Sequence, residues 1–193
     1  MIAAYPHVEF AASLCTHKRY AIDGGAHRGG VTSLLTKLGF QWIIAVEPGP
    51  SFDRLRVRFE NMGHVTLLEA ALGNVHNQMV WYGTPKPSAG SKIWYADAKR
   101  PGNVRMVRLD EEFPNLPTVD LVKLDLEGGE LNALRGMERT LLANRPVVVC
   151  ETSDLIPQPQ HEDGPGRPNL LNYMAGLGYE IAATFEVDTV WRF

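Results

Sequence analysis

Short apolar runs alternate with amphipathic stretches along most of the chain. Runs rich in valine, isoleucine and leucine predict strands at 19–23, 42–46, 65–69, 119–126 and 147–150. Between them, apolar residues recur at helical spacing and predict helices at 31–38, 51–62 and 131–141. Strands that alternate with helices in this way are typical of a mostly parallel α/β sheet.

The two ends and the middle of the chain are less regular. Residues 3–18 predict a helix that covers one edge of the sheet, and 170–177 predict a short final helix. A terminal hairpin follows, with strands at 180–187 and 189–193 that turn at Asp188. In the middle, strand segments at 78–82 and 104–109 flank a long loop rich in proline, glycine and aromatic residues, which could contact a substrate.

Three acidic residues stand where predicted strands end. Asp125 and Glu127 stand where the strand at 119–126 gives way to the next helix, and Glu151 follows the strand at 147–150. The carboxyl ends of parallel strands share one edge of a sheet, which is where ligands bind in open α/β folds. Glu127 could instead only favour the N-terminus of the next helix. Three converging carboxylates repel one another unless a cation or a proton intervenes, so we treat the cluster as a candidate site.

A glycine-rich loop follows the first strand. It reads Asp23, Gly24, Gly25, Ala26, His27, Arg28, Gly29, and the frame G-x-G-x-x-G of dinucleotide-binding proteins is absent from it. An acid at this position suits an ammonium or sulfonium group better than a pyrophosphate. About twenty residues later, Glu47 and Pro48 follow the second strand, where a carboxylate can accept hydrogen bonds from a ribose diol.

Small residues follow the third strand. Ala70 and Ala71 stand where an adenine ring would need a flat apolar wall, although core packing also explains them. Each of these features has an ordinary structural explanation when taken alone. Their order and spacing together favour a site for S-adenosylmethionine.

Composition narrows the class of protein. The chain has 193 residues, of which 45% are hydrophobic, so we expect one domain over 1–193 with a substantial core. A net charge of −3 gives no basic field for nucleic acid or an anionic membrane. Cys15 and Cys150 lie far apart, and no apolar run is long enough to span a membrane, so a cytoplasmic protein with reduced thiols is expected. The oligomeric state is left open.

Three blocks of the sequence resemble one family, the FkbM-type S-adenosylmethionine-dependent methyltransferases. The blocks are AIDGGAHRGG, AVEPGPSFDRL and VDLVKLDLEGGELNALRGMERTLLANRPVVVCE. The third is the most specific, and its motif residues are Lys123, Asp125, Glu127, Gly128, Leu134, Arg135 and Gly136. The resemblance implies a Rossmann-like class I methyltransferase fold, with a seven-stranded mostly parallel sheet, an antiparallel last strand and helices on both faces. It also implies methyl transfer, most often to a hydroxyl oxygen of a metabolite or sugar.

The resemblance also implies roles for individual residues. Asp23, Gly25 and Ala26 would hold the methionine end of the cofactor, within a loop completed by Gly24, His27 and Gly29. Glu47, followed by Pro48, would bind the ribose, and Ala70 with Ala71 would line the adenine. Asp125 would lie near the transferred methyl group. The sequence departs from the family at His27, where asparagine is usual.

The acids suggest how an acceptor hydroxyl could lose its proton. Asp125, Glu127 and Glu151 could take it directly or through a hard divalent cation such as magnesium, and no metal site is assigned. The cluster could equally be satisfied by backbone amides and the cationic cofactor. The expected partner is a small hydroxylated molecule rather than nucleic acid, because no Asn/Asp-Pro-Pro-aromatic run follows the fourth strand. Two alternatives stay open: a nicotinamide-dependent oxidoreductase and a non-catalytic cofactor-binding module.

Overall fold

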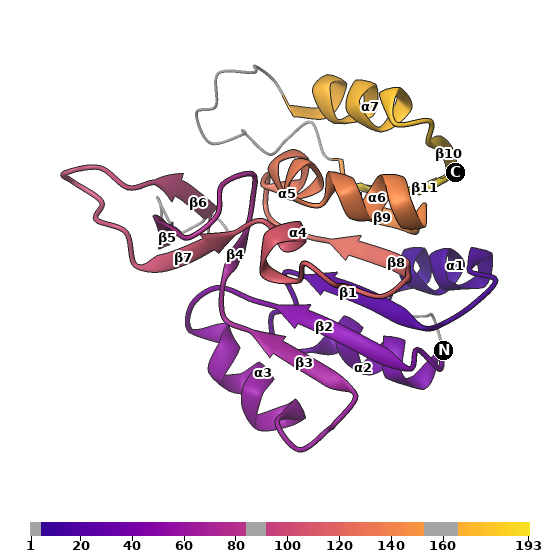
Figure 1. Ribbon diagram of the computed structural model, residues 1–193, viewed down its shortest axis with the longest axis horizontal. Coiled ribbons are helices and arrows are strands. Elements are labelled where there is room, and N and C mark those ends of the chain that lie inside the picture. The colour runs from indigo at the N-terminus through magenta and orange to yellow at the C-terminus, as the bar shows by residue number, and fades with distance from the viewer. Residues whose placement is uncertain (1–4, 84–91, 153–165) are drawn as a thin grey trace.

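The main sheet has seven strands (Figure 1). The computed structural model describes residues 5–83, 92–152 and 166–193. The strand order is β10-β11-β9-β8-β1-β2-β3, and β11 runs antiparallel to both of its neighbours while the other pairs are parallel. These strands are β1 (Tyr20–Gly24), β2 (Trp42–Val46), β3 (Val65–Leu68), β8 (Val119–Leu124), β9 (Val147–Glu151), β10 (Glu180–Phe185) and β11 (Asp188–Arg192). The predicted fold class is confirmed.

Helices cover both faces of this sheet, because successive strand residues point to opposite sides. In β1, Ala21 packs under the first group of helices and Ile22 under the second. The first group is α1 (Pro6–Leu14), α2 (Gly30–Lys37) and α3 (Ser51–Phe59). The second group is α4 (Leu109–Glu112), α5 (Glu130–Gly136), α6 (Glu138–Asn144) and α7 (Gly166–Gly176). The prediction that the first helix covers a sheet edge is wrong, since α1 packs on the face formed by β8, β9 and β11.

A second, smaller sheet lies beyond the carboxyl ends of the central strands, at the left of Figure 1. Its order is β4-β7-β5-β6, and its strands are β4 (Ala71–Leu72), β5 (Gln78–Gly83), β6 (Lys92–Tyr95) and β7 (Val104–Val107). The sequence predicts a loop where β6 lies, because four residues are too few to show a period. The strand is stabilised instead by antiparallel pairing with β5.

The single helix predicted at 131–141 is two helices, α5 and α6, which meet at Met137. Asp110, from α4, provides the cap for the second one. Its carboxylate accepts hydrogen bonds from the backbone N–H groups of Arg139 and Thr140, at 2.8 and 3.2 Å, and from the Thr140 hydroxyl at 2.6 Å. These bonds satisfy donors that a continuous helix would have paired internally, and so they stabilise the break.

Near the C-terminus, the hairpin turns at Glu186 and Val187 rather than at Asp188. Asp188 already pairs with Glu151 of β9 and with Phe185 of β10, so it belongs to the sheet. Within the described residues, no helix is long and apolar enough to cross a membrane.

Candidate functional site

A cavity of about 400 Å³ opens at the carboxyl edge of β1, β2 and β8. Residues of the second sheet, on β5, β6 and β7, also line it. The structure brings these predicted site residues to its lining: Gly25, His27, Glu47, Pro48, Ala70, Ala71, Asp125 and Glu127. The other predicted residues, Asp23, Gly24, Ala26, Gly29 and Glu151, do not line it in the part of the chain that the structure describes.

The loop after β1 approaches the neighbouring strands very closely at Gly25. This residue has φ +72°, and an added Cβ would collide with the carbonyl oxygen of Asp125. Its backbone N–H donates to the carbonyl of Val46, at 2.9 Å, and the N–H of Ala26 donates to the same oxygen at 3.0 Å. The loop therefore crosses between the ends of β2 and β8, where only a glycine fits.

Glu47 directly follows β2 and lines the cavity. Its side chain is only 4% exposed, and one carboxylate oxygen, Oε2, accepts a 2.9 Å hydrogen bond from the backbone N–H of His27. His27 itself has φ +50°, a left-handed conformation that histidine and asparagine tolerate better than most residues. Burial raises the pKa of Glu47 to about 7, against the opposing effects of the His27 hydrogen bond and the Lys123 charge.

Asp23 lies behind the loop rather than in the cavity. Its side chain is fully buried on the face covered by α2, where the Thr32 hydroxyl donates a 2.6 Å hydrogen bond to Oδ2. Lys123, its register partner on β8, places its ammonium 3.3 Å from Oδ1. The predicted role of Asp23 at the methionine end would thus have to act through the loop rather than by direct contact within the described cavity.

The three acids Asp125, Glu127 and Glu151 differ in how far their side chains are exposed. Asp125 is 53% exposed and Glu127, at φ +54°, is half-buried, and both line the cavity. Glu151 is half-buried beside it. Burial raises its pKa to about 7, assisted by the charges of Glu130, Asp125, Glu127 and Asp188. No group of three or more histidine, cysteine or acidic residues in the described segments is arranged to hold a metal ion, so the magnesium alternative finds no support there.

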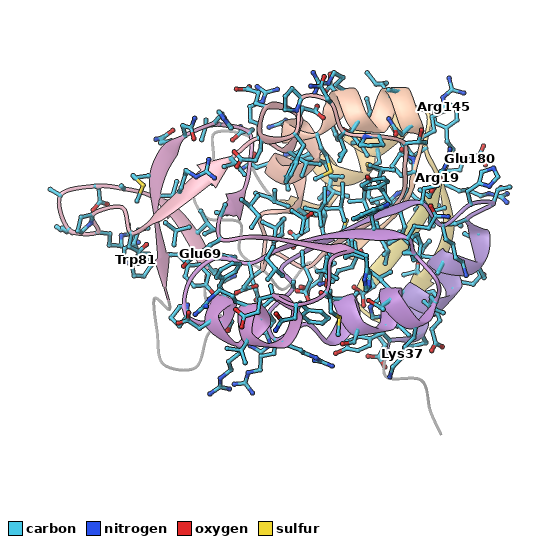
Figure 2. The ribbon with its side chains drawn as sticks, turned by 60° about the horizontal axis from the view of Figure 1, so that its bottom comes forward. Arg19, Lys37, Glu69, Trp81, Arg145 and Glu180 are labelled. Atoms are coloured by element: carbon cyan, nitrogen blue, oxygen red, sulfur yellow. The ribbon has the colours of Figure 1, made fainter. Side chains whose placement is uncertain are left out.

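Part of the lining was not anticipated from sequence. Asn132 lines the cavity because it belongs to the first turn of α5, and that turn opens at the carboxyl edge. Tyr82, Ile93 and Met106 reach the cavity only because β5, β6 and β7 pair into the second sheet. The remaining lining residues are Val46, Ser51, Leu72, Leu126 and Gly129. Figure 2 shows Glu69 and Trp81 at this end of the molecule and Arg19 at the opposite end.

The residues present fit a cofactor with an adenosine half and a charged amino-acid half. The cavity offers an apolar wall at Ala70, Ala71 and Leu72, and a buried carboxylate at Glu47. Gly25 leaves room for the backbone to approach a ligand. No phosphate-binding glycine frame stands at the same loop.

Comparisons with solved structures show the same fold. An FkbM methyltransferase from Methylobacillus flagellatus KT has a TM-score of 0.62 at 19% identity, covering 99% of this chain and 48% of that one. The chain thus spans about half the length of that relative. A putative methyltransferase from Streptococcus mutans, in complex with S-adenosylhomocysteine, has a TM-score of 0.57 at 10% identity, covering 100% of this chain and 99% of that one.

A precorrin-6y C5,15-methyltransferase from Geobacter metallireducens GS-15 also has a TM-score of 0.57, at 17% identity, covering 100% of this chain and 89% of that one. No curated protein sequence matches the chain significantly. The model of the methyltransferase FkbM domain matches residues 23–181, which is most of the chain and includes every strand end that lines the cavity. The chain therefore belongs to the FkbM methyltransferase family.

Proposed function

We propose that the chain binds S-adenosylmethionine in the cavity and transfers its methyl group to a hydroxyl oxygen of a small metabolite or sugar. The observation that carries this proposal is the buried carboxylate of Glu47, oriented by His27 at the end of β2 and facing a cavity with an apolar wall. Family membership and the fold shared with a relative in complex with S-adenosylhomocysteine support it.

Each half of the cavity has a task in this proposal. Glu47 accepts hydrogen bonds from the ribose diol, while Ala70 and Ala71 lie against the adenine. The loop at Gly25, together with Asp125, borders the amino-acid half. The bound cofactor supplies a methyl group activated by its positively charged sulfur, so the protein has mainly to align the acceptor and remove its proton.

Two carboxylates border the place from which an acceptor proton would leave. Asp125 and Glu127 both line the cavity, and we assign the general base to this pair. Glu151 lies within electrostatic reach of both, since their charges help to raise its pKa to about 7.

Methyl transfer to a panel of sugars and hydroxylated metabolites, each matched with its amino analogue, tests the proposal by mass spectrometry of the products. The expected result is a gain of one methyl group on oxygen. Methylated amines only would contradict the acceptor class, and no methylation of any compound would contradict the activity. Full activity in a chelator is expected if carboxylates act directly, whereas loss of activity would favour the metal version.

A further inference from the structure

We propose that Lys123 is a positioning residue of the cofactor site that sets its charge. It holds the glycine loop through backbone carbonyls and neutralises Asp23, and it thereby limits how strongly the cavity prefers a sulfonium ligand over the neutral thioether product. This inference rests on the proposed function, because it concerns S-adenosylmethionine and S-adenosylhomocysteine as the two ligands.

The ammonium of Lys123 lies at the junction of β1 and β8. The residue is only 5% exposed, and Nζ donates hydrogen bonds to the carbonyl oxygens of Gly24 and Gly25, at 3.3 and 3.1 Å. The same atom lies 3.3 Å from Asp23 and 3.8 Å from Asp125. One cation thus connects the loop after β1 with the acids of both strands.

These contacts fix the loop from two sides. The carbonyl oxygen of Gly25 accepts a hydrogen bond from Nζ of Lys123. The backbone N–H of Gly25 donates to the carbonyl of Val46 at the end of β2. Because Gly25 also packs against the backbone of Asp125, a shift of the loop would change the cavity wall itself. Loss of the Lys123 ammonium would displace the loop and would therefore weaken the binding of both ligands by the same factor.

The charge of Lys123 acts differently on the two ligands. Burial alone would lower the pKa of Lys123, but the carboxylates of Asp23 and Asp125 outweigh it and raise the pKa, so the ammonium stays protonated. S-adenosylmethionine and S-adenosylhomocysteine differ by one methyl group and one positive charge at sulfur. The ratio of their affinities therefore reports the charge of the site, while effects of loop position largely cancel.

Isothermal titration calorimetry of both ligands against matched variants tests the proposal. Removing the cation in Lys123→Met should raise the preference for S-adenosylmethionine, and removing the anion in Asp23→Asn should lower it. A unit charge at roughly 10 Å and an effective dielectric of about 20 corresponds to a change of about tenfold in this ratio. The double variant should return the ratio to near the wild-type value, and Lys123→Arg should keep it.

Arg19→Met is the matched structural control. Arg19 and Asp120 form an ion pair of 2.6 Å that also joins β1 to β8, but at the amino ends of these strands. Its loss should lower stability and leave the affinity ratio unchanged. Should Lys123→Met fail to fold, the affinity ratios of Asp23→Asn and of the double variant still test the proposal.

Ratios that stay within twofold of wild type in Asp23→Asn and in any folded Lys123→Met would overturn the inference, as would an equal shift in Arg19→Met. Failure of the wild-type protein to bind either ligand would instead contradict the proposed function. The two failures are therefore distinguishable.

Discussion

The backbone N–H of His27 donates a 2.9 Å hydrogen bond to the carboxylate of Glu47, so the loop after β1 and the end of β2 meet at one side chain. The two residues are twenty positions apart in sequence. The bond occupies Oε2 of Glu47 and fixes the plane of a carboxylate that lines the cavity. A ligand that donates from two adjacent hydroxyls therefore meets an oriented acceptor rather than a mobile one.

Glu47→Gln should weaken the binding of S-adenosylhomocysteine about 10- to 100-fold, because a hydrogen bond to a charged group contributes about 1.5–3 kcal/mol. The amide keeps an oxygen for His27 but loses the charge and one acceptor. Glu69→Gln is the control, since Glu69 follows the adjacent strand β3 and is exposed outside the cavity. Equal affinities of the two variants, measured by calorimetry, would exclude Glu47 from the site.

Gly25→Ala should abolish measurable ligand binding and lower the melting temperature. Its backbone has φ +72°, and the new methyl group would collide with the carbonyl of Asp125. Gly39→Ala separates the two effects, because Gly39 has φ +90° but no atom within 4 Å of the added methyl group. We expect the control to lose about 1–2 kcal/mol of stability and to bind normally. Normal binding by Gly25→Ala would mean that the loop can move without loss of function.

Glu130→Gln should reduce the dependence of stability on pH. Glu130 is 2% exposed and accepts a 2.7 Å hydrogen bond from the N–H of Leu126, and burial raises its pKa from 4.5 to about 7. The native state thus holds this proton more tightly than the unfolded state. Its stabilising contribution is fully present below about pH 4.5 and is lost as the pH rises to about 7, which amounts to about 3 kcal/mol.

Urea unfolding of the wild type and of Glu130→Gln at pH 5 and pH 8 measures this contribution. The fall in free energy of unfolding between the two pH values should be smaller in the variant, because Glu130 no longer contributes to it. The fall should not vanish, because Glu47 and Glu151 remain and titrate in the same direction. An identical fall in both proteins would show that Glu130 does not change its protonation state in this range.

Tyr82→Ala tests whether the second sheet covers the adenosine half of the site. Tyr82 lines the cavity, and its ring packs against Gly49 in the loop after β2. We expect the variant to bind adenosine and S-adenosylhomocysteine about tenfold more weakly, by the same factor for both, because they share the part that is covered. Different factors for the two ligands would place Tyr82 near the amino-acid half instead.

Trp81→Ala is the matched control on the same strand. Trp81 does not line the cavity within the described residues, and the guanidinium of Arg100 lies 5.7 Å from its ring centroid. Its loss should lower the stability of the second sheet and leave both affinities unchanged. A drop in affinity equal to that of Tyr82→Ala would attribute both effects to unfolding of the sheet.

The sequence alone predicts those residues of the site that lie at the ends of strands. Gly25, Glu47 and Asp125 could be grouped because the carboxyl ends of parallel strands share an edge, and local patterns define those ends. The backbone position of Asp23, near the carboxyl end of β1, could be predicted in the same way. Its side chain, however, is paired with Lys123 across the β1–β8 register, and a strand pattern alone does not specify which side chains are neighbours.

The rest depended on contacts between distant segments. Tyr82 and Ile93 reach the cavity through the pairing of β5 with β6, and Asp110 breaks a helix that begins twenty residues after it. Neither relationship has a local signature, because long-range pairing and side-chain capping from another element are decided by the packed structure. The long loop before β8 was therefore the least predictable region.

Calorimetric titration of the wild-type protein with S-adenosylhomocysteine and with NAD tests the central claim most directly. The arrangement of Gly25, Glu47 and Asp125 predicts saturable binding of S-adenosylhomocysteine at one site, competed by S-adenosylmethionine, and no heat of binding with NAD. Saturable binding of NAD, or no binding of S-adenosylhomocysteine, would contradict the account.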